Sequence, residues 1–231
     1  MASSKVAAVI ALSRLIGPLT QDAAPLALPL SGVLVVIGLI SIVWGTFAAI
    51  AQRELRRMLA YSAVANAGFL ALVLGCGADG RAASIFYAIV YALTTVLAFA
   101  ALAGRGPEPL AMSDLRLENL GALRALALVI ALLSLAGIPP LPGFWTKVAV
   151  LDASWAVLGF WPTLIATLGG VFGALYYLRP LPDLLAIVRA AGAGRLPVSS
   201  TPAVLLAGVA VVFVAFAPAV VYALARFALG G

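Results

Sequence analysis

Long apolar runs separated by short arginine-bearing segments constrain this chain more than any other feature of its sequence. A bilayer span needs about 20 mainly apolar residues, and about seven stretches come near or exceed that length: 2–18, 30–51, 58–77, 82–104, 120–152, 155–178 and 201–228. Hydrophobic residues make up 65% of the chain and charged residues 10%, unlike a soluble domain. The sequence therefore predicts an all-α, polytopic transmembrane helix bundle, with residues 1–231 as a single membrane domain and no soluble domain.

The arginines fall mainly on one side of the expected membrane. In a topology of this kind, the arginine-rich segments 53–57, 105–124 and 179–195 share a side. The positive-inside rule places them in the cytoplasm, so we expect an inner (cytoplasmic) membrane protein with its N-terminus cytoplasmic and its C-terminus outside. Residues 181–200 are too polar to span and predict a cytoplasmic loop with an interfacial helix. Topology thus explains the net charge of +6, and nucleic-acid binding is not expected.

Residues that bind metals and prosthetic groups are scarce. The chain has no histidine and a single cysteine, Cys76, which excludes a disulfide framework and the usual ligands of zinc, haem and iron–sulfur clusters. We expect no metal and no cofactor in this chain. The segment Met1–Leu19 has Lys5 ahead of an apolar stretch, but Arg14 interrupts that stretch and a small-x-small cleavage site is missing. These features argue against a cleaved signal peptide.

Lysine occurs only at Lys5 and Lys147, and both positions fall inside expected spans. Arginine keeps its proton, whereas a desolvated lysine can load and release one near neutral pH. A lysine at mid-membrane costs about 2.5–3.5 kcal/mol on insertion scales. Lys147 lies deep in an apolar run, so we interpret it as functional and not as a side chain that reaches to the interface. For Lys5, near the first residue, both interpretations stay open.

The fifth apolar stretch is too long for one straight span and is interrupted by proline. Because proline has no backbone donor, the helix must break over residues 138–143. The residues of the expected break are Pro139, Pro140, Pro142 and Gly143. Transporters form ion sites at broken helices, although a proline kink can also serve packing alone. The three prolines close to Lys147 favour an ion site.

Polar side chains inside the expected spans form a candidate proton pathway through hydrogen-bonded water: Tyr61, Ser62, Asn66, Tyr87, Tyr91, Thr94 and Thr95. Their other interpretation is structural, because serine and threonine in membrane helices often bond to their own backbone or join helices. No aspartate or glutamate lies deep in an expected span, and Asp152 comes closest. A carboxylate partner for the lysines would therefore come from another chain.

Several segments together resemble a known family. Residues 134–147, SLAGIPPLPGFWTK, closely resemble the broken-helix motif of the antiporter-like subunits of NADH-quinone oxidoreductase, and among them subunit N most. Residues 4–8 resemble part of the eighth helix of that family, and residues 56–69 resemble the loop before the tenth helix and its start. Residues 91–95 and 176–179 resemble parts of the eleventh and thirteenth helices. The resemblance covers nearly the whole chain. It implies the second half, helices eight to fourteen, of a fourteen-helix fold with two inverted five-helix repeats.

The resemblance also implies roles for individual residues. Lys5 would be the central proton carrier, Lys147 the carrier in the broken helix, and Tyr61 to Asn66 together with Tyr91 the lining of a hydrophilic axis. The chain would be a non-redox, proton-translocating subunit in the membrane arm of respiratory complex I. Flavin, iron–sulfur clusters and quinone are expected in other subunits. Where relatives commonly carry histidine, this chain has Asn66, which cannot titrate.

The expected partners are lipid and other membrane-arm subunits, including a separate chain for the first repeat if that repeat is not encoded with this one. Two further functions stay open. A subunit of a multi-subunit cation/proton antiporter or of a membrane-bound hydrogenase would share the fold. A non-conducting structural subunit of the membrane arm is favoured by the missing acidic partner. The sequence does not separate proton from sodium as the coupling ion.

Overall fold

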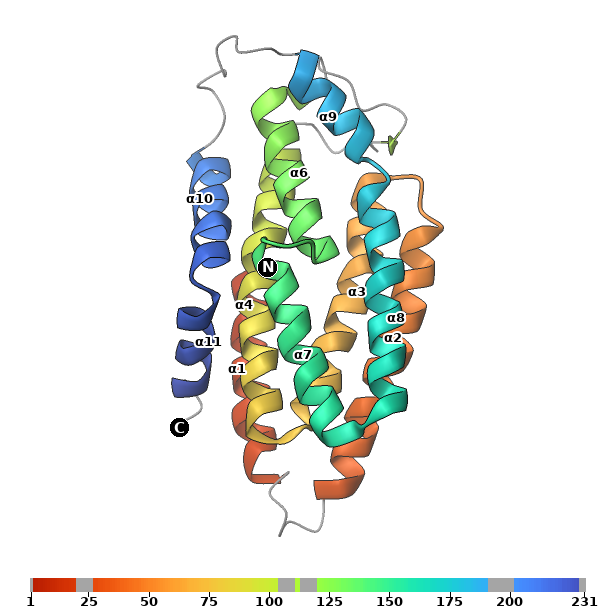
Figure 1. The fold of residues 1–231 in the computed structure, drawn as a ribbon, viewed down its shortest axis with the longest axis vertical. Coiled ribbons are helices and arrows are strands. Elements are labelled where there is room, and N and C mark those ends of the chain that lie inside the picture. Colours follow the sequence, from red (N-terminus) through yellow and green to blue (C-terminus); the bar gives the residue numbers. More distant parts are fainter. Residues whose placement is uncertain (1, 20–26, 104–110, 113–119, 191–201, 229–231) are drawn as a thin grey trace.

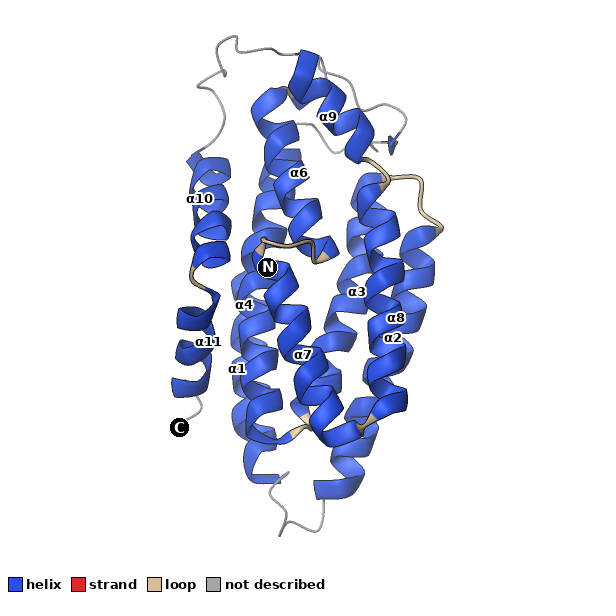
Figure 2. Ribbon diagram, viewed as in Figure 1, coloured by secondary structure: helices blue, strands red, loops and turns tan. Residues whose placement is uncertain are grey.

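The computed structural model describes residues 2–19, 27–103, 111–112, 120–190 and 202–228. Figure 1 shows an elongated bundle of helices, and Figure 2 shows that helix is its dominant element. Within the described ranges, extended pairing is limited to one antiparallel bridge between Glu54 and Ala111. The expected all-α fold is confirmed.

The helices follow the apolar stretches of the sequence. They are α1 (Ala2–Leu19), α2 (Ala27–Ile50), α3 (Leu55–Leu74), α4 (Gly77–Leu102), α6 (Ala122–Ala136), α7 (Pro142–Leu158), α8 (Phe160–Leu178), α9 (Leu181–Ala190), α10 (Pro202–Phe216) and α11 (Pro218–Phe227). In the described part of the chain, α2, α3, α4 and the segment of α8 with α9 are each long and apolar enough to cross a membrane. The bent pair α10 and α11 adds a further span if it is counted as one.

Most helix ends lie within a few residues of the expected spans, but two features differ in kind. The fifth and sixth stretches separate at Gly159, later than expected, because Gly159 adopts a φ of 76° that favours glycine. The last stretch bends by 90° between Phe216 and Pro218, where the proline removes a backbone donor. Of the segment 181–200, residues 181–190 form α9, and the rest lies outside the described residues.

Helix α4 is the element around which the others pack. It contacts α1, α3, α6, α7, α10 and α11, and Figure 1 shows it running along the long axis behind α6 and α7. Small residues allow these close approaches, since Ala83, Ala98 and Ala101 of α4 are almost completely buried. The broken helix therefore packs both of its halves against one continuous helix.

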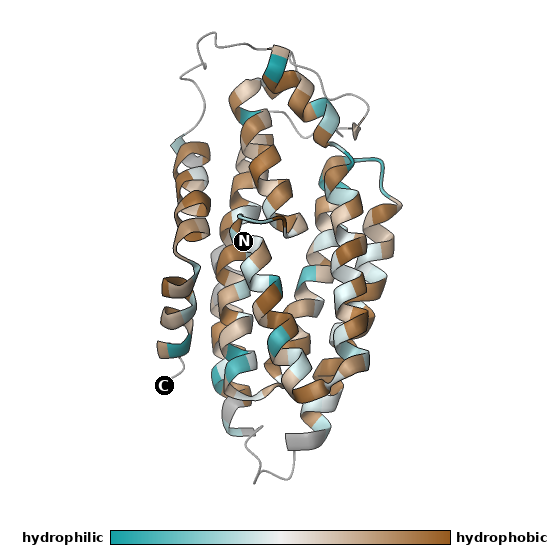
Figure 3. Cartoon of the chain, viewed as in Figure 1, coloured by the Kyte–Doolittle hydropathy of each residue, from teal (hydrophilic) through white to brown (hydrophobic). Residues whose placement is uncertain are grey.

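The surface matches that of an integral, multi-pass membrane protein. Figure 3 shows apolar residues over most of the bundle. At the turn between α7 and α8, Trp155, Phe160 and Trp161 are exposed by 59%, 53% and 71%, and aromatic side chains are typical of the membrane–water interface.

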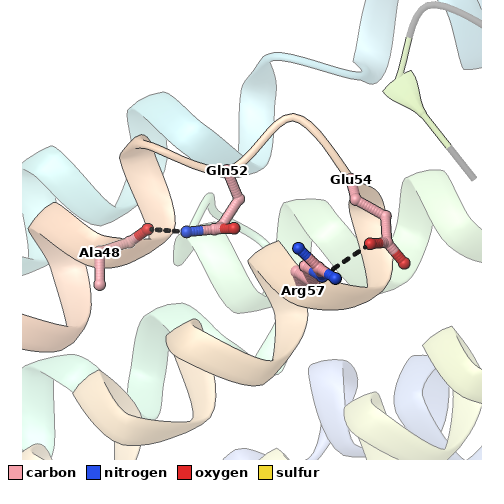
Figure 4. A network of polar contacts seen from close by, with 4 residues as sticks. All are labelled: Ala48, Gln52, Glu54 and Arg57. Carbon is pink, nitrogen blue, oxygen red and sulfur yellow. Dashed lines mark hydrogen bonds and ion pairs between the residues drawn. The ribbon is translucent and has the colours of Figure 1, made fainter. Parts of the chain in front are cut away.

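The loop between α2 and α3 carries polar contacts (Figure 4). Gln52 Nε2 donates to the Ala48 carbonyl at 2.9 Å, and Glu54 pairs with Arg57 at 3.0 Å. Arg179, directly after α8, donates to the Gln52 carbonyl at 3.1 Å. The first two contacts are local to the α2–α3 loop, and the Arg179 bond joins the end of α8 to that loop.

Candidate functional site at the broken helix

The helix breaks where the prolines predict. Helix α6 ends at Ala136, and Gly137 follows with a φ of 82°. The N–H groups of Gly137 and Ile138 both donate to the Leu133 carbonyl, at 3.2 and 3.1 Å, in the manner of a glycine C-cap. Helix α7 begins at Pro142, a position that needs no backbone donor. A break at the proline motif is therefore confirmed, but it covers residues 137–141, and Pro142 and Gly143 belong to the first turn of α7. Figure 1 places the break near the middle of the long axis of the bundle.

Ser134 bonds across the break. Its Oγ accepts a hydrogen bond from the Gly143 N–H at 3.3 Å, one of the amides that a helix N-terminus leaves without an intrahelical partner. A Cβ atom at Gly143 would clash with the Ser134 carbonyl oxygen. Thr146 then donates to the Gly143 carbonyl at 2.9 Å. Close packing and these bonds fix the start of α7 against the last turns of α6.

Lys147 reaches back across the break from the second turn of α7. Its Nζ donates to the Ala136 carbonyl at 2.8 Å, and the side chain is half-buried. The last carbonyls of a helix lack intrahelical partners and carry the negative end of the helix dipole. The C-terminus of α6 therefore provides a favourable contact for a cationic amine inside the bundle.

A small cavity adjoins this lysine. The volume open to the centre of a water molecule is about 10 Å³, which is about what one water molecule requires. The lining combines α3, α4, α6 and α7: Asn66, Tyr87, Val90, Tyr91, Thr94, Ser134, Leu135, Gly143, Thr146 and Lys147. An amide, two phenols and three hydroxyls thus surround a space beside the amine.

Asn66 joins three helices next to the cavity. Tyr87 of α4 donates to Asn66 Oδ1 at 2.7 Å, and Asn66 Nδ2 donates to Tyr177 Oη of α8 at 3.1 Å. The same Nδ2 donates to the Ser62 carbonyl at 2.7 Å. Each polar atom of the Asn66 amide therefore has a partner in the bundle interior.

The structure brings some of the predicted site residues together. Lys147, Asn66, Tyr91 and Thr94 line one cavity, and Ser62 is buried one turn from Asn66. The Thr94 hydroxyl donates to its own helix at Val90, 2.7 Å away, as the structural interpretation of threonine predicts.

Other predicted residues lie away from this cavity. Tyr61 is 40% exposed on the outside of α3, and Thr95 is partly buried on α4 but does not line the cavity. Lys5 belongs to α1, and its side chain lies outside the described residues. Pro139 and Pro140 are exposed. The proton-carrying roles of Tyr61, Thr95 and Lys5 stay predictions.

Three polar residues of the site, Tyr177, Ser134 and Thr146, were not predicted as site residues. Tyr177 occurs in a segment that resembles the family, and Ser134 and Thr146 belong to the broken-helix motif, so a signal existed for each. Their contacts depend on packing between distant helices, which the sequence does not show. Among the described residues, no group of three or more histidine, cysteine, aspartate or glutamate side chains comes together as a metal site.

Comparison with known proteins gives a consistent result. The family model described as NADH:quinone oxidoreductase/Mrp antiporter, TM, matches residues 1–173. Subunit N of the NADH-quinone oxidoreductase of Coxiella burnetii is 36% identical over 208 residues, which is 84% of this chain and 42% of the relative. Subunit 14 of that enzyme in Thermus thermophilus is 41% identical over 179 residues, which is 76% of this chain and 38% of the relative. The chain spans less than half the length of these relatives.

Solved structures share the fold. A chain of respiratory complex I from Thermus thermophilus with bound aureothin is 34% identical, with a TM-score of 0.69 over 88% of this chain and 46% of that one. A chain of an archaeal membrane-bound sulfane sulfur reductase gives a TM-score of 0.81 at 21% identity, covering 96% of this chain and 47% of that one. A chain of the Mrp complex from a Dietzia species gives 0.78 at 19% identity, covering 97% and 50%. The last two show the fold alone.

Proposed function

Because the chain belongs to the NADH:quinone oxidoreductase/Mrp antiporter family, we propose that it is a proton-translocating membrane-arm subunit of a complex I-type NADH-quinone oxidoreductase. It carries no redox centre of its own in this proposal. Quinone reduction elsewhere in the assembly changes the charge around the intramembrane lysines and shifts their protonation equilibrium. Other membrane-arm subunits stand beside it, with flavin and iron–sulfur clusters in further subunits. Its N-terminus faces the cytoplasm and its C-terminus the outside.

One observation carries the proposal: the amine of Lys147 lies at a helix break beside a polar cavity, 2.8 Å from the Ala136 carbonyl. A lysine in such a place can take a proton from water in the cavity and return it. Asn66, Tyr91 and Thr94 supply the polar lining that supports water there. Lys5 passes protons towards Lys147, and Ser62, Tyr61 and Thr95 extend the pathway along α3 and α4.

Replacing Lys147 by alanine tests this role. In vesicles of native membrane, Lys147→Ala is expected to lower the number of protons moved per electron from NADH, because one carrier is lost, while the assembly stays intact on a native gel. Val148→Ala is the matched control, since Val148 is the next residue of α7 and is 42% exposed on its surface. An unchanged proton-to-electron ratio in Lys147→Ala would show that Lys147 carries no proton and would favour a non-conducting structural subunit.

A second candidate function is ion exchange in a multi-subunit cation/proton antiporter. The family description includes the Mrp antiporter, and the fold resembles a chain of an Mrp complex with a TM-score of 0.78. Purification of the native assembly with mass spectrometry of every subunit separates the two. Flavin and iron–sulfur subunits support the oxidoreductase; an assembly of small membrane subunits alone supports the antiporter.

A further inference from the structure

Gly137 lies directly against the side chain of Lys147. A Cβ atom added to Gly137 would be 2.9 Å from Cδ and 3.2 Å from Nζ of Lys147, closer than two such groups can pack without moving. The lysine chain therefore occupies the space that a side chain at position 137 would need. The φ of 82° at Gly137 favours glycine for a separate, backbone reason.

Gly137 leaves room for the amine of Lys147 to reach a partly negative carbonyl group. The amine of Lys147 donates to the carbonyl oxygen of Ala136, in the last turn of α6, where the helix dipole adds partial negative charge. A hydrogen bond from an ammonium is roughly twice as strong as one from a neutral donor. The Ala136 carbonyl therefore stabilises the protonated lysine more than the neutral amine.

We propose that Gly137 is a positioning residue that lets protonated Lys147 rest on the Ala136 carbonyl, and that the amine leaves this carbonyl to exchange its proton in the adjoining cavity. The proposal rests on the proton-carrying function proposed for Lys147. In the exchange, the ammonium gives one proton to a water molecule and keeps its electron pair as a neutral amine. A neutral amine bonds the Ala136 carbonyl less strongly, so the side chain returns to that carbonyl once it is protonated again.

The other groups around the lysine do not offer the same contact. The cavity presents hydroxyl, amide and phenol groups from α3, α4 and α6. On the helices packed against α7, the buried titratable side chains are phenols, Tyr87 and Tyr91 on α4 and Tyr176 and Tyr177 on α8. The charged side chains of α3, α4 and α6 lie in the first turns of those helices: Arg56, Arg57, Asp79, Arg81 and Arg124. Phenols ordinarily stay neutral below about pH 10. On α7 itself, Asp152 is exposed, and the described residues of α10 include no acid or base.

The test measures proton translocation against pH in vesicles of native membrane that contain the whole assembly. Gly137→Ala pushes Lys147 off the carbonyl, so we expect the alkaline limb of the pH profile to move to lower pH by about one to two units. Gly137→Asn is expected to do the same. Because asparagine tolerates positive φ better than alanine, this variant separates the blocked contact from backbone strain.

Gly159→Ala is the matched control. Gly159 also has a positive φ, 76°, but its ψ of −156° disfavours other residues more strongly than the left-handed conformation of Gly137. Nothing lies within 4 Å of a Cβ added to Gly159, so Gly159→Ala strains the backbone at least as much without touching Lys147. The proposal is overturned if both Gly137 variants keep the wild-type limb, or if Gly159→Ala moves the limb as far. Lys147→Ala in the same vesicles separates the proton-carrying function of Lys147 from the positioning role of Gly137. Full pumping by Lys147→Ala overturns the proposed function. Lost pumping by Lys147→Ala, together with unmoved pH profiles in the Gly137 variants, overturns only the positioning role.

Discussion

Asn66 connects α3 with α4 through its amide oxygen and with α8 through its amide nitrogen. Tyr87 lies 21 residues away and Tyr177 lies 111 residues away along the chain. The sequence identified Asn66, Tyr87 and Tyr91 as polar residues in apolar helices. It did not identify their partners, because a bond across 111 residues depends on how α8 packs against α3. The burial of Asn66 to 4% exposure makes these bonds important for stability.

Replacing Asn66 by leucine keeps the approximate volume and removes the bonds. The Tyr87 hydroxyl then loses its buried acceptor, at a cost of about 1–3 kcal/mol for a group left unsatisfied, and Tyr177 loses one of its partners. Thermal unfolding of the purified protein in detergent should show a lower midpoint for Asn66→Leu. Val64→Ala on the exposed side of the same helix is the control, and equal midpoints for the two variants would contradict this role of the amide.

Helices α2 and α3 form the most extensive pair in the bundle, and glycines set their separation. A Cβ atom at Gly38 of α2 would lie 2.8 Å from the backbone nitrogen of Leu72 and 2.9 Å from the Gly68 carbonyl oxygen. Small residues at such contacts let membrane helices approach closely. Close packing between α2 and α3 fixes the position of α3 and therefore of Asn66.

Gly38→Ala is expected to destabilise the protein by about 1–3 kcal/mol, because the added methyl group pushes α2 away from α3. Gly32 lies on the same helix, and nothing lies within 4 Å of a Cβ atom added to it. Gly32→Ala is therefore expected to be neutral or slightly stabilising, since alanine favours helix. Unfolding midpoints of the two variants measure the difference. Equal midpoints would mean that α2 and α3 can separate without cost.

The elements differ in how well the sequence predicted them. The break after α6 was predicted because three closely spaced prolines leave no helical alternative. The bend before Pro218 was missed, because a single proline in an apolar run is compatible with either a kink or a straight span. The turn at Gly159 was misplaced by several residues, because nothing polar marks it and the conformation of that one glycine decides it.

The whole molecule has two distinct ends. One carries the α2–α3 loop with Arg179 bonded to it. The other carries the turns between α3 and α4 and between α7 and α8, where Asp79 at the start of α4 pairs with Arg226 of α11. The exposed aromatic residues of the α7–α8 turn at this second end are of the kind typical of a membrane–water interface. The assignment of the first end to the cytoplasm stays a prediction from the positive-inside rule.

Cysteine labelling tests that assignment. Ala51 in the α2–α3 loop and Ala78 at the start of α4 are both exposed, and the natural Cys76 is buried. In intact cells, a maleimide that cannot cross membranes should label Ala78→Cys and leave Ala51→Cys unlabelled until the membrane is permeabilised. The reverse pattern would invert the proposed orientation, and the unmodified protein supplies the background.

The amide at the centre of the cluster also gives its hydrogen bonds a fixed sense. The Asn66 oxygen can only accept and its nitrogen can only donate, so the bonds run from Tyr87 to Asn66 and from Asn66 to Tyr177. In a row of hydroxyl groups alone, every bond can reverse together when one proton enters and another leaves. This row cannot reverse without turning the amide over, which would break its bond to the Ser62 carbonyl. The interior of the bundle therefore keeps one hydrogen-bond polarity across α4, α3 and α8.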